Sequence, residues 1–391
     1  MWQRDLTSSE CFCYFPDVDN DFLHLAKPLI RIPTAPFHEH FALDFVRSFV
    51  AERPQITSRF DRSGNCLLVY EGSSKTSGDL LVLTAHLDHP GMVWRRSLAS
   101  GRSLFEILGG VDLDQALATG VRIFDLNRPA SQRGWTGKIV GTVEDPGTHN
   151  PLLEVASTPT SSQGPGTFAM WDLPAFRLRG RRLSGRALDD LAGAAVGLSV
   201  LDALHRAKAP VGIGLLLTRA EEVGFVGMLA ALEAGFLRRR ALYINIECSS
   251  VKAGAVQGAG PIVRVGDRLW VFDPAISGGL SALANEIEKE DPLFRHQRKL
   301  MDSGACEATP LMQAGYRTGA VALPLGNYHN LGPGGKLEPE DINVDDAQML
   351  VQLLVHLARR GIDTALSRST DALDTKLAGR LAKYRTRLSP I

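Results

Sequence analysis

The chain has 391 residues, enough for two domains, and its 44% hydrophobic and 22% charged residues are ordinary for a globular protein. Its 43 Lys and Arg residues balance 43 Asp and Glu residues, so bulk charge gives no argument for nucleic acid or an anionic membrane as a partner. No apolar run approaches the ~20 residues of a membrane span. Five cysteines without a CxxC pair fit a reducing compartment, and the first residues lack the apolar core of a signal peptide. We therefore expect a cytoplasmic protein without nucleic-acid or membrane partners.

The first part of the chain has the texture of an α/β domain. Residues 1–20 are polar and irregular, and residues 21–52 show a helical rhythm that breaks near Pro33. Residues 59–70 predict a hairpin, because two β-like runs flank an Arg-Ser-Gly-Asn turn. The continuous apolar run at 80–86 predicts a buried strand.

The middle of the chain, residues 95–183, has a different texture. Helical periodicity is weak there, and short β-like runs alternate with Gly, Pro and Ser breaks. Such runs are typical of a small barrel or sandwich. They are Val121–Phe124, Gly137–Val143 and Phe176–Arg179. We interpret this segment as a small β-barrel-like domain inserted into the α/β domain.

From residue 184 the α/β texture returns, as strands alternating with helices. The predicted elements are a helix over Leu191–Ala207, a strand over Val211–Thr218, a helix over Phe225–Phe236, strands over Ala241–Glu247 and Thr318–Leu325, and a helix over Pro339–Arg360. This alternation predicts an α/β fold with a mostly parallel sheet covered by helices on both faces. The predicted organisation is a catalytic domain in two parts (1–94 and 184–360), the insertion (95–183), and a C-terminal extension (361–391). We expect this extension to be a solvated basic helix, with a subunit or partner contact as the alternative.

The predicted strand at 80–86 ends in residues that can bind a metal ion. It is followed at once by a His-x-Asp pattern formed by His86 and Asp88. Ligands of open α/β sheets bind at the carboxyl ends of strands, and a metal-binding His usually donates its other ring N–H to a carboxylate. On its own, this pattern is more often an ordinary strand end than a metal site.

Further candidate ligands stand at other predicted strand ends or in the turns after them. The full set is His86, Asp189, Glu222, Glu247 and His329. Each is weak alone, since acidic pairs and strand-end carboxylates are usually solvated. Together, three carboxylates and two imidazoles suit two divalent cations, one carboxylate bridging them. We expect two ions per subunit, with zinc as the first expectation and cobalt or manganese as alternatives.

A spare carboxylate stands next to one of these ligands. Glu221 precedes Glu222 directly, and a carboxylate beside a metal pair can serve as general base and then as general acid. Two ions roughly 3.5–4 Å apart can polarise a carbonyl and lower the pKa of a water. The constellation thus predicts metal-assisted hydrolysis.

The order of these motifs resembles the M42 family of co-catalytic metallo-aminopeptidases (the glutamyl and tetrahedral aminopeptidase group), within the zinc exopeptidase clan. The resemblance extends from about Leu25 to Leu357, and it includes the roughly hundred-residue gap between His86 and Asp189. The motifs that carry it are the Ile32–Pro36 turn, the Asp61–Asn65 turn, Thr84–Asp88, Gly185–Gly193, Glu221–Gly224 and Tyr328–His329.

The resemblance implies a role for each candidate residue. Asp189 would bridge the ions. His86 and Glu247 would complete one ion, and Glu222 and His329 the other. Asp88 would orient His86, and Glu221 would carry the proton. It also implies a homo-oligomer, for example a dodecamer, that closes around a chamber through the inserted domain.

The chain departs from the family pattern at three positions. Glu247 stands where the family usually has Asp, so the ion there would sit differently or bind less tightly. His89 follows the His-x-Asp pattern where an acidic residue is more usual. It is a candidate extra ligand, but we expect a pocket or surface side chain instead. Glu307 lies in a stretch that departs from the family's Gly-Gly-Thr-Asp, where it could meet a substrate's amino terminus.

These observations predict an aminopeptidase that removes N-terminal residues from short peptides. One alternative is a metallo-deacylase, amidohydrolase or carboxypeptidase that uses the same metals, because fold and metals do not select the leaving group. A second alternative is an assembly protein that has lost activity. The complete ligand set and the retained Glu221 argue against this second alternative.

Overall fold

The architecture was determined as a computed structural model of the whole chain. It describes residues 18–361 and 374–387, apart from positions 74–79, 99–100, 111–116, 118, 129–133, 146, 149 and 158–162. The polar lead-in predicted for residues 1–20 therefore lies almost entirely outside the described residues.

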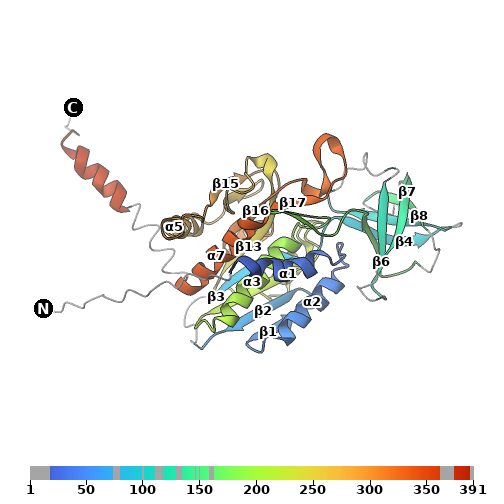
Figure 1. Ribbon diagram of the computed structural model, residues 1–391, viewed down its shortest axis with the longest axis horizontal. Coiled ribbons are helices and arrows are strands. Elements are labelled where there is room, and N and C mark those ends of the chain that lie inside the picture. The colour runs from blue at the N-terminus through green and yellow to red at the C-terminus, as the bar shows by residue number, and fades with distance from the viewer. Residues whose placement is uncertain are drawn as a thin grey trace.

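A central eight-stranded sheet organises the larger part of the molecule (Figure 1). In spatial order its strands are β1 (Ile56–Phe60), β2 (Cys66–Glu71), β12 (Gly212–Thr218), β3 (Leu80–His86), β13 (Ala241–Ser250), β16 (Arg317–Leu325), β14 (Ile262–Asp267) and β15 (Gln297–Met301). The four inner strands β12, β3, β13 and β16 are mutually parallel. Their carboxyl ends therefore meet at one edge of the sheet. The predicted hairpin is present, since β1 and β2 pair antiparallel.

Helices cover both faces of this sheet. One face carries α1 (Val18–Ile30), α2 (His40–Ala51), α3 (Leu191–Arg206), α5 (Pro274–Glu290) and α7 (Val344–Arg360), and the other carries α4 (Val226–Glu233) and α6 (Ala308–Gln313). Strand β3 shows why both faces must be covered. Leu81 and Leu83 join the core on the first face, while Leu80 and Val82 join the core on the second. A continuous apolar run can be buried in this way only between two layers of helices.

Helix α3 lies closest to the centre of the core. It is rich in small residues and nearly all of its side chains are buried. At Gly197 a Cβ atom would lie only 2.6 Å from a methyl carbon of Leu215 on β12, so glycine allows the helix to approach the sheet closely. This packing fixes the start of α3, where Asp189 and Asp190 stand, against the carboxyl edge of the sheet.

Between β3 and α3 the chain forms a closed six-stranded barrel at one end of the molecule (Figure 1). Its strands, in order around the barrel, are β4 (Gly91–Ser97), β5 (Arg102–Leu108), β8 (Leu152–Ser157), β7 (Trp135–Val143), β6 (Gly120–Asp125) and β9 (Thr167–Trp171). The barrel has its own apolar core, which includes Phe105, Ile139 and Val155. The predicted fold class, an α/β sheet with an inserted barrel, is confirmed. The exact domain boundaries stay a prediction.

Three expectations about individual elements are corrected. Phe176–Arg179 was expected among the barrel strands, but β10 (Arg177–Arg179) forms a separate small sheet with β11 (Arg182–Gly185) and β17 (Glu340–Asn343). The last helix was expected from Pro339, but it begins at Val344, because residues 340–343 pair with β11 and the Asn343 side chain accepts from the Asp345 amide at 2.8 Å. Strand β13 continues past Glu247 to Ser250.

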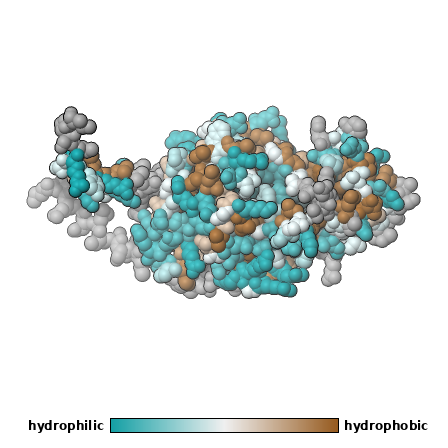
Figure 2. All heavy atoms as spheres, turned by 90° about the horizontal axis from the view of Figure 1, so that it is seen from above, coloured by the Kyte–Doolittle hydropathy of each residue, from teal (hydrophilic) through white to brown (hydrophobic). Residues whose placement is uncertain are grey.

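The remaining elements are short. Four 3-10 helices are described, η2 (Val251–Ala253), η3 (Tyr328–Asn330), η4 (Pro333–Gly335) and η5 (Arg385–Arg387). In the C-terminal extension, residues 374–384 are helical and every one is exposed, as expected for a solvated basic helix. Hydrophilic residues dominate the face of the molecule in Figure 2, with apolar side chains scattered among them. Among the described helices, none is both long enough and apolar enough to cross a bilayer.

Candidate metal centre and active site

The predicted site residues come from four adjacent parallel strands and one helix start. His86 is the last residue of β3, and Glu247 lies on the neighbouring strand β13. Glu221 and Glu222 lie in the turn after β12, and His329 lies in η3 after β16. Asp189 precedes α3, to which it is joined through a cis peptide bond to Asp190. All of them converge at the carboxyl edge of the sheet, as ligand sites of this fold class do.

One group of potential ligands surrounds His86. Its Nε2 atom lies 3.4 Å from Asp189 Oδ1 and 3.6 Å from Glu247 Oε1. All three side chains are buried, and their ligand atoms lie within 4.8 Å of one another, close enough to share one ion. Because Glu247 also accepts from the Cys248 amide at 3.2 Å, its carboxylate is held toward this group.

A second group surrounds His329. Its Nε2 atom lies 3.2 Å from Glu222 Oε2 and 3.8 Å from Asp189 Oδ2. These three residues also present ligand atoms within 4.8 Å of one another. The two carboxylate oxygens of Asp189 therefore point into different groups, one toward His86 and the other toward His329. This is the arrangement of a carboxylate that bridges two cation positions.

Glu221 lies beside the group around His86. Its Oε2 atom is 4.0 Å from His86 Nε2, and its side chain is largely buried. Glu221 also forms a further group of potential ligand atoms with His86 and Glu222. Burial raises the pKa of Glu221 well above its usual range, which favours a carboxyl group that can take up a proton.

Asp88 holds the turn that carries both glutamates. Its Oδ1 accepts from the Glu221 amide at 2.9 Å and its Oδ2 from the Glu222 amide at 3.1 Å. The His86 ring lies farther off, with Nδ1 3.5 Å from Asp88 Oδ1 and 3.2 Å from the Asp88 carbonyl oxygen. The sequence predicted a partner for His86 alone. The backbone of the glutamate turn could not be foreseen as a second partner, because it lies 133 residues away.

Two buried acids that the sequence did not single out position the ligands. Glu340 on β17 accepts from the amides of Asp189 at 3.1 Å and His329 at 3.0 Å, so one carboxylate anchors a residue of each group. Glu39 accepts from the Ala220 amide at 3.0 Å and from Arg219 Nε at 2.7 Å, directly before Glu221. Glu340 was expected inside the helix over Pro339–Arg360, so nothing in the sequence marked it as a partner of the ligands.

His89 is buried and fully engaged. Its Nδ1 lies 2.7 Å from the Asp189 carbonyl oxygen and its Nε2 lies 3.2 Å from Asn330 Oδ1. Because both ring nitrogens are in hydrogen bonds, His89 has no atom left to bind a cation. Its contact with the Asp189 carbonyl oxygen helps to orient Asp189. The expectation that His89 could be a surface side chain is wrong, because the side chain is almost completely buried.

The cluster carries more buried negative charge than its imidazoles can balance. Burial and the neighbouring Glu247 raise the pKa of Asp189 well above its usual range. Burial alone would lower the pKa of His329, but Glu222 outweighs it and raises that pKa to about 10. The same pair lowers the pKa of Glu222 to about 2, against the effect of burial. The surrounding acids raise the pKa values of both His86 and His329, which shows how much buried negative charge the site holds. A cation bound to the neutral imidazoles would balance this charge in place of their protons.

The residues therefore fit a divalent-cation centre. Asp189 Oδ1, Glu222 Oε1, Glu247 Oε2 and His329 Nε2 are buried atoms that have no hydrogen-bond partner among the described residues. Leaving such atoms unpaired is costly unless a ligand satisfies them. Mixed carboxylate and imidazole donors are those that zinc and similar ions take in hydrolases.

Glu307 lies beside the cluster but in none of its ligand groups. It is completely buried before α6, and its Oε2 accepts from Thr218 Oγ1 at 2.8 Å, while Oε1 has no partner among the described residues. Burial raises the pKa of Glu307 to about 8. Thr218 is the residue of β12 that pairs with His86, so Glu307 stands next to the histidine strand end.

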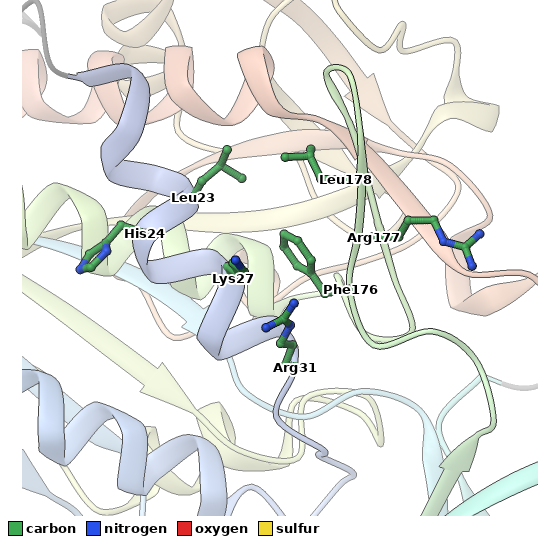
Figure 3. A pocket seen from close by; sticks show the side chains of 7 residues that line it. All are labelled: Leu23, His24, Lys27, Arg31, Phe176, Arg177 and Leu178. Carbon is green, nitrogen blue, oxygen red and sulfur yellow. The ribbon is translucent and has the colours of Figure 1, made fainter. Parts of the chain in front are cut away.

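A pocket of about 730 Å³ lies elsewhere, between α1 and the β10–β11 hairpin (Figure 3). Leu23, His24 and Lys27 line it from α1, and Arg31 lines it from the turn after that helix. Phe176, Arg177 and Leu178 line it from the hairpin side. None of these residues belongs to the ligand groups, so we do not assign this pocket to the catalytic chemistry. We call it the basic groove, because its charged lining residues are Lys27, Arg31 and Arg177 and no acid lines it.

The fold and the cluster together define an α/β hydrolytic scaffold with an inserted barrel and a carboxylate–imidazole centre. Comparison with protein families gives a match to the model of the M42 glutamyl aminopeptidases over residues 159–342. This match confirms the resemblance to the M42 family, and with it the prediction that the chain is an enzyme, a hydrolase of the aminopeptidase type. A comparison with curated protein sequences finds no significant match.

Solved structures show the same fold. An aminopeptidase from the archaeon Desulfurococcus kamchatkensis aligns with a TM-score of 0.71 at 19% identity, over 89% of this chain and 97% of that one. A TET aminopeptidase from a marine sediment archaeon of the Thaumarchaeota aligns with a TM-score of 0.73 at 16% identity, over 89% and 99%. The TET1 peptidase of Pyrococcus horikoshii, which can assemble into a tetrahedron or a large octahedral shell, aligns with a TM-score of 0.68 at 19% identity, over 86% and 99%.

Proposed function

We propose that the protein is a metal-dependent aminopeptidase that removes N-terminal residues from short peptides. One observation carries the proposal: two ligand groups, one around His86 and one around His329, share the two oxygens of Asp189. A buried carboxylate whose two oxygens face two separate groups of ligand atoms is what a bridged pair of cations would require. The family match supports the peptidase class.

In this proposal His86, Asp189 and Glu247 hold one cation, and Asp189, Glu222 and His329 hold the other. Zinc is the first expectation, with cobalt or manganese as alternatives. When bound, such a pair polarises the scissile carbonyl group and lowers the pKa of a water. The protein's own contribution is to orient the ligand side chains. Asp88 accepts the backbone amide of Glu222, and Glu340 accepts those of Asp189 and His329, which fixes three of the five ligand residues.

Glu221 carries the proton. Its carboxylate stands 4.0 Å from the His86 ring, and the Asp88 hydrogen bond to its amide fixes the turn that presents it. A buried carboxyl group with a raised pKa can accept a proton from a nucleophilic water and return it to the leaving amine. Asp88 is a positioning residue here, since its own oxygens are occupied by backbone amides.

The preference for a free amino terminus is supported by the surplus of acids. Besides the ligands, Glu221 and Glu307 are buried beside the centre, and Glu307 keeps one oxygen without a partner among the described residues. An ammonium group would balance this charge, whereas an N-acyl group or a substrate carboxylate would not. This favours an aminopeptidase over a deacylase or a carboxypeptidase built on the same metals.

The homo-oligomer expected from the sequence is also part of this proposal. The Pyrococcus horikoshii TET1 peptidase assembles into closed shells, and another similar structure is described as a dodecamer. A closed shell would restrict substrates to short peptides that can enter it. The cytoplasmic location expected from the cysteine content stays a prediction.

The test is metal content and turnover in one series of proteins. Purified wild type is expected to bind roughly two divalent ions per chain and to cleave aminoacyl substrates with a free amino group but not their N-acylated counterparts. Glu221→Gln is expected to keep the metal and lose about 10²–10⁴-fold in rate, because only the proton carrier is removed. The neighbouring Glu222→Gln is the matched control, and it is expected to lose metal and turnover together.

Each contrary result is informative. Cleavage of only N-blocked substrates would keep the metal centre and reject the aminopeptidase. Cleavage from the carboxyl end would reject it equally. If neither metal binding nor turnover appeared with zinc, cobalt or manganese, the chain would be the inactive assembly protein of the second alternative.

A further inference from the structure

The C-terminal helix over residues 374–384 presents an uncovered apolar stripe. Leu377, Leu381 and Tyr384 are spaced four and three residues apart, so they lie on one face of the helix. Their side chains are 50%, 46% and 46% exposed. Helices of globular domains bury such a stripe against a partner. This one touches no core of the described protein.

The charges around this stripe are of one sign. From residue 374 to residue 387 the chain has one acid, Asp374, and five cations, Lys376, Arg380, Lys383, Arg385 and Arg387. On a helical projection all the cations except Arg385 flank one edge of the stripe. Lys383 and Arg387 lie over the Tyr384 ring, with their charged groups 5.2 and 5.8 Å from its centre. The balanced composition of the whole chain conceals this local excess.

The charge decides what can cover the stripe. Pairing with the same helix of a second copy would place five further cations around one short apolar contact, with only Asp374 of each copy to offset them, which disfavours a coiled coil. Docking into the basic groove of this chain or of another copy would repeat the conflict, because Lys27, Arg31 and Arg177 line that groove. The partner must therefore be anionic and must also accept apolar side chains.

We propose that this helix binds the surface of a membrane that contains anionic lipids. Leu377, Leu381 and Tyr384 enter the boundary between headgroups and acyl chains, and the flanking Lys and Arg side chains reach the lipid phosphates. An apolar face bordered by cations is the pattern of helices that lie in a bilayer interface. Anionic headgroups attract such basic segments electrostatically, within about a Debye length. The proposal departs from the expectation, based on bulk charge, that no membrane is a partner.

Binding through this helix is independent of the catalytic chemistry, but its strength rests on the homo-oligomer of the proposed function. A single short helix binds weakly, but a homo-oligomer presents several copies to the same surface, and the contacts then reinforce one another. The result would be a peptidase held at an anionic membrane face without crossing it.

The experiment is co-sedimentation of the full-length protein with vesicles. We expect wild type to pellet with vesicles containing phosphatidylglycerol, to stay in solution with pure phosphatidylcholine vesicles, and to be released by salt. Leu381→Glu is expected to abolish pelleting. Ala382→Glu is the matched control, because it adds the same charge one residue away on the far side of the helix, and it is expected to retain most of the binding.

Three results would overturn the proposal. Wild type could stay in solution with both kinds of vesicle, which would point to an acidic protein groove instead. It could pellet equally with phosphatidylcholine, which would remove the role of the cations. The two glutamate variants could behave alike, which would mean that the apolar stripe is not the contact. Cleavage of a soluble aminoacyl substrate, measured alongside, should be the same in all three proteins, so failure here is separate from failure of the catalytic proposal.

Discussion

Asp88 offers the sharpest test of how the site is built. Its carboxylate accepts the amides of Glu221 and Glu222, one on each oxygen, and is completely buried. Asp88→Asn keeps the size of the side chain but leaves one acceptor oxygen, and its NH₂ group then faces a backbone N–H. One amide of the glutamate turn must lose its partner. The turn, and the carboxylates it presents, should shift as a consequence.

The magnitude follows from the bond that is lost. A hydrogen bond to a charged group contributes about 1.5–3 kcal/mol, so Asp88→Asn should lower the free energy of unfolding by roughly that amount. The effect on the centre is separate, because Glu222 is a proposed ligand. Residues that orient metal ligands typically change metal affinity by about 10–100-fold when they are mutated. We expect a loss of affinity in this range and a lower rate at saturating metal.

Asp346 provides the matched control. Its buried carboxylate also accepts two backbone amides, those of Gly258 and Gly260, each at 2.8 Å, but it lies in no ligand group. Asp346→Asn should therefore cost a similar free energy of unfolding in urea and leave metal affinity unchanged, as measured by chelator competition. The reasoning is refuted if Asp88→Asn binds metal like wild type, or if both variants lose affinity equally.

Three further outcomes are expected. Glu247→Gln should lower the metal content toward one ion per chain, while Glu307→Gln should not, as elemental analysis would show. Gly193→Ala should destabilise the fold by about 1–3 kcal/mol in urea unfolding, because its Cβ would lie 2.2 Å from Asp190 Oδ1. Burial lowers the pKa of His38 below its unfolded value, so the folded state resists protonation. Stability should fall as pH drops below about 6.5, and His38→Gln should reduce that slope in denaturant titrations; an unchanged slope would contradict it.

The sequence predicted that the candidate ligands lie close together because they stand at strand ends. The apolar run before His86 and the run before Glu221 are short, continuous and bounded by turn signals, and both are strands with nearly those limits. Once the sheet is parallel, the ends of neighbouring strands meet, so residues far apart in sequence come together without any knowledge of their contacts. The local hydrophobic pattern and the rule that parallel strand ends meet were therefore enough to bring these residues together.

The supporting acids could not be predicted in the same way. Strand β17, which carries Glu340, has four residues, too few to show a period of two, and it runs directly into the strongly periodic helix α7. Its strand character comes from pairing with β11, about 160 residues earlier in the chain. The prediction that Phe176–Arg179 belongs to the barrel was wrong for a related reason. The composition of this run resembles that of the barrel strands, and only its pairing with β11 separates it from them. Short elements defined by distant partners leave no local signal.

Glu247 illustrates what a difference of one methylene requires of its surroundings. Its Oε1 reaches to 3.6 Å from His86 and also accepts from the Cys248 amide. The second contact bends the longer side chain back on its own backbone, which shortens its reach toward that of an Asp. A Glu at this position is therefore compatible with the cation position shared by His86 and Asp189. If this is correct, Glu247→Asp should bind the first ion less tightly than wild type, because the shorter side chain gives up either the amide contact or the ligand contact.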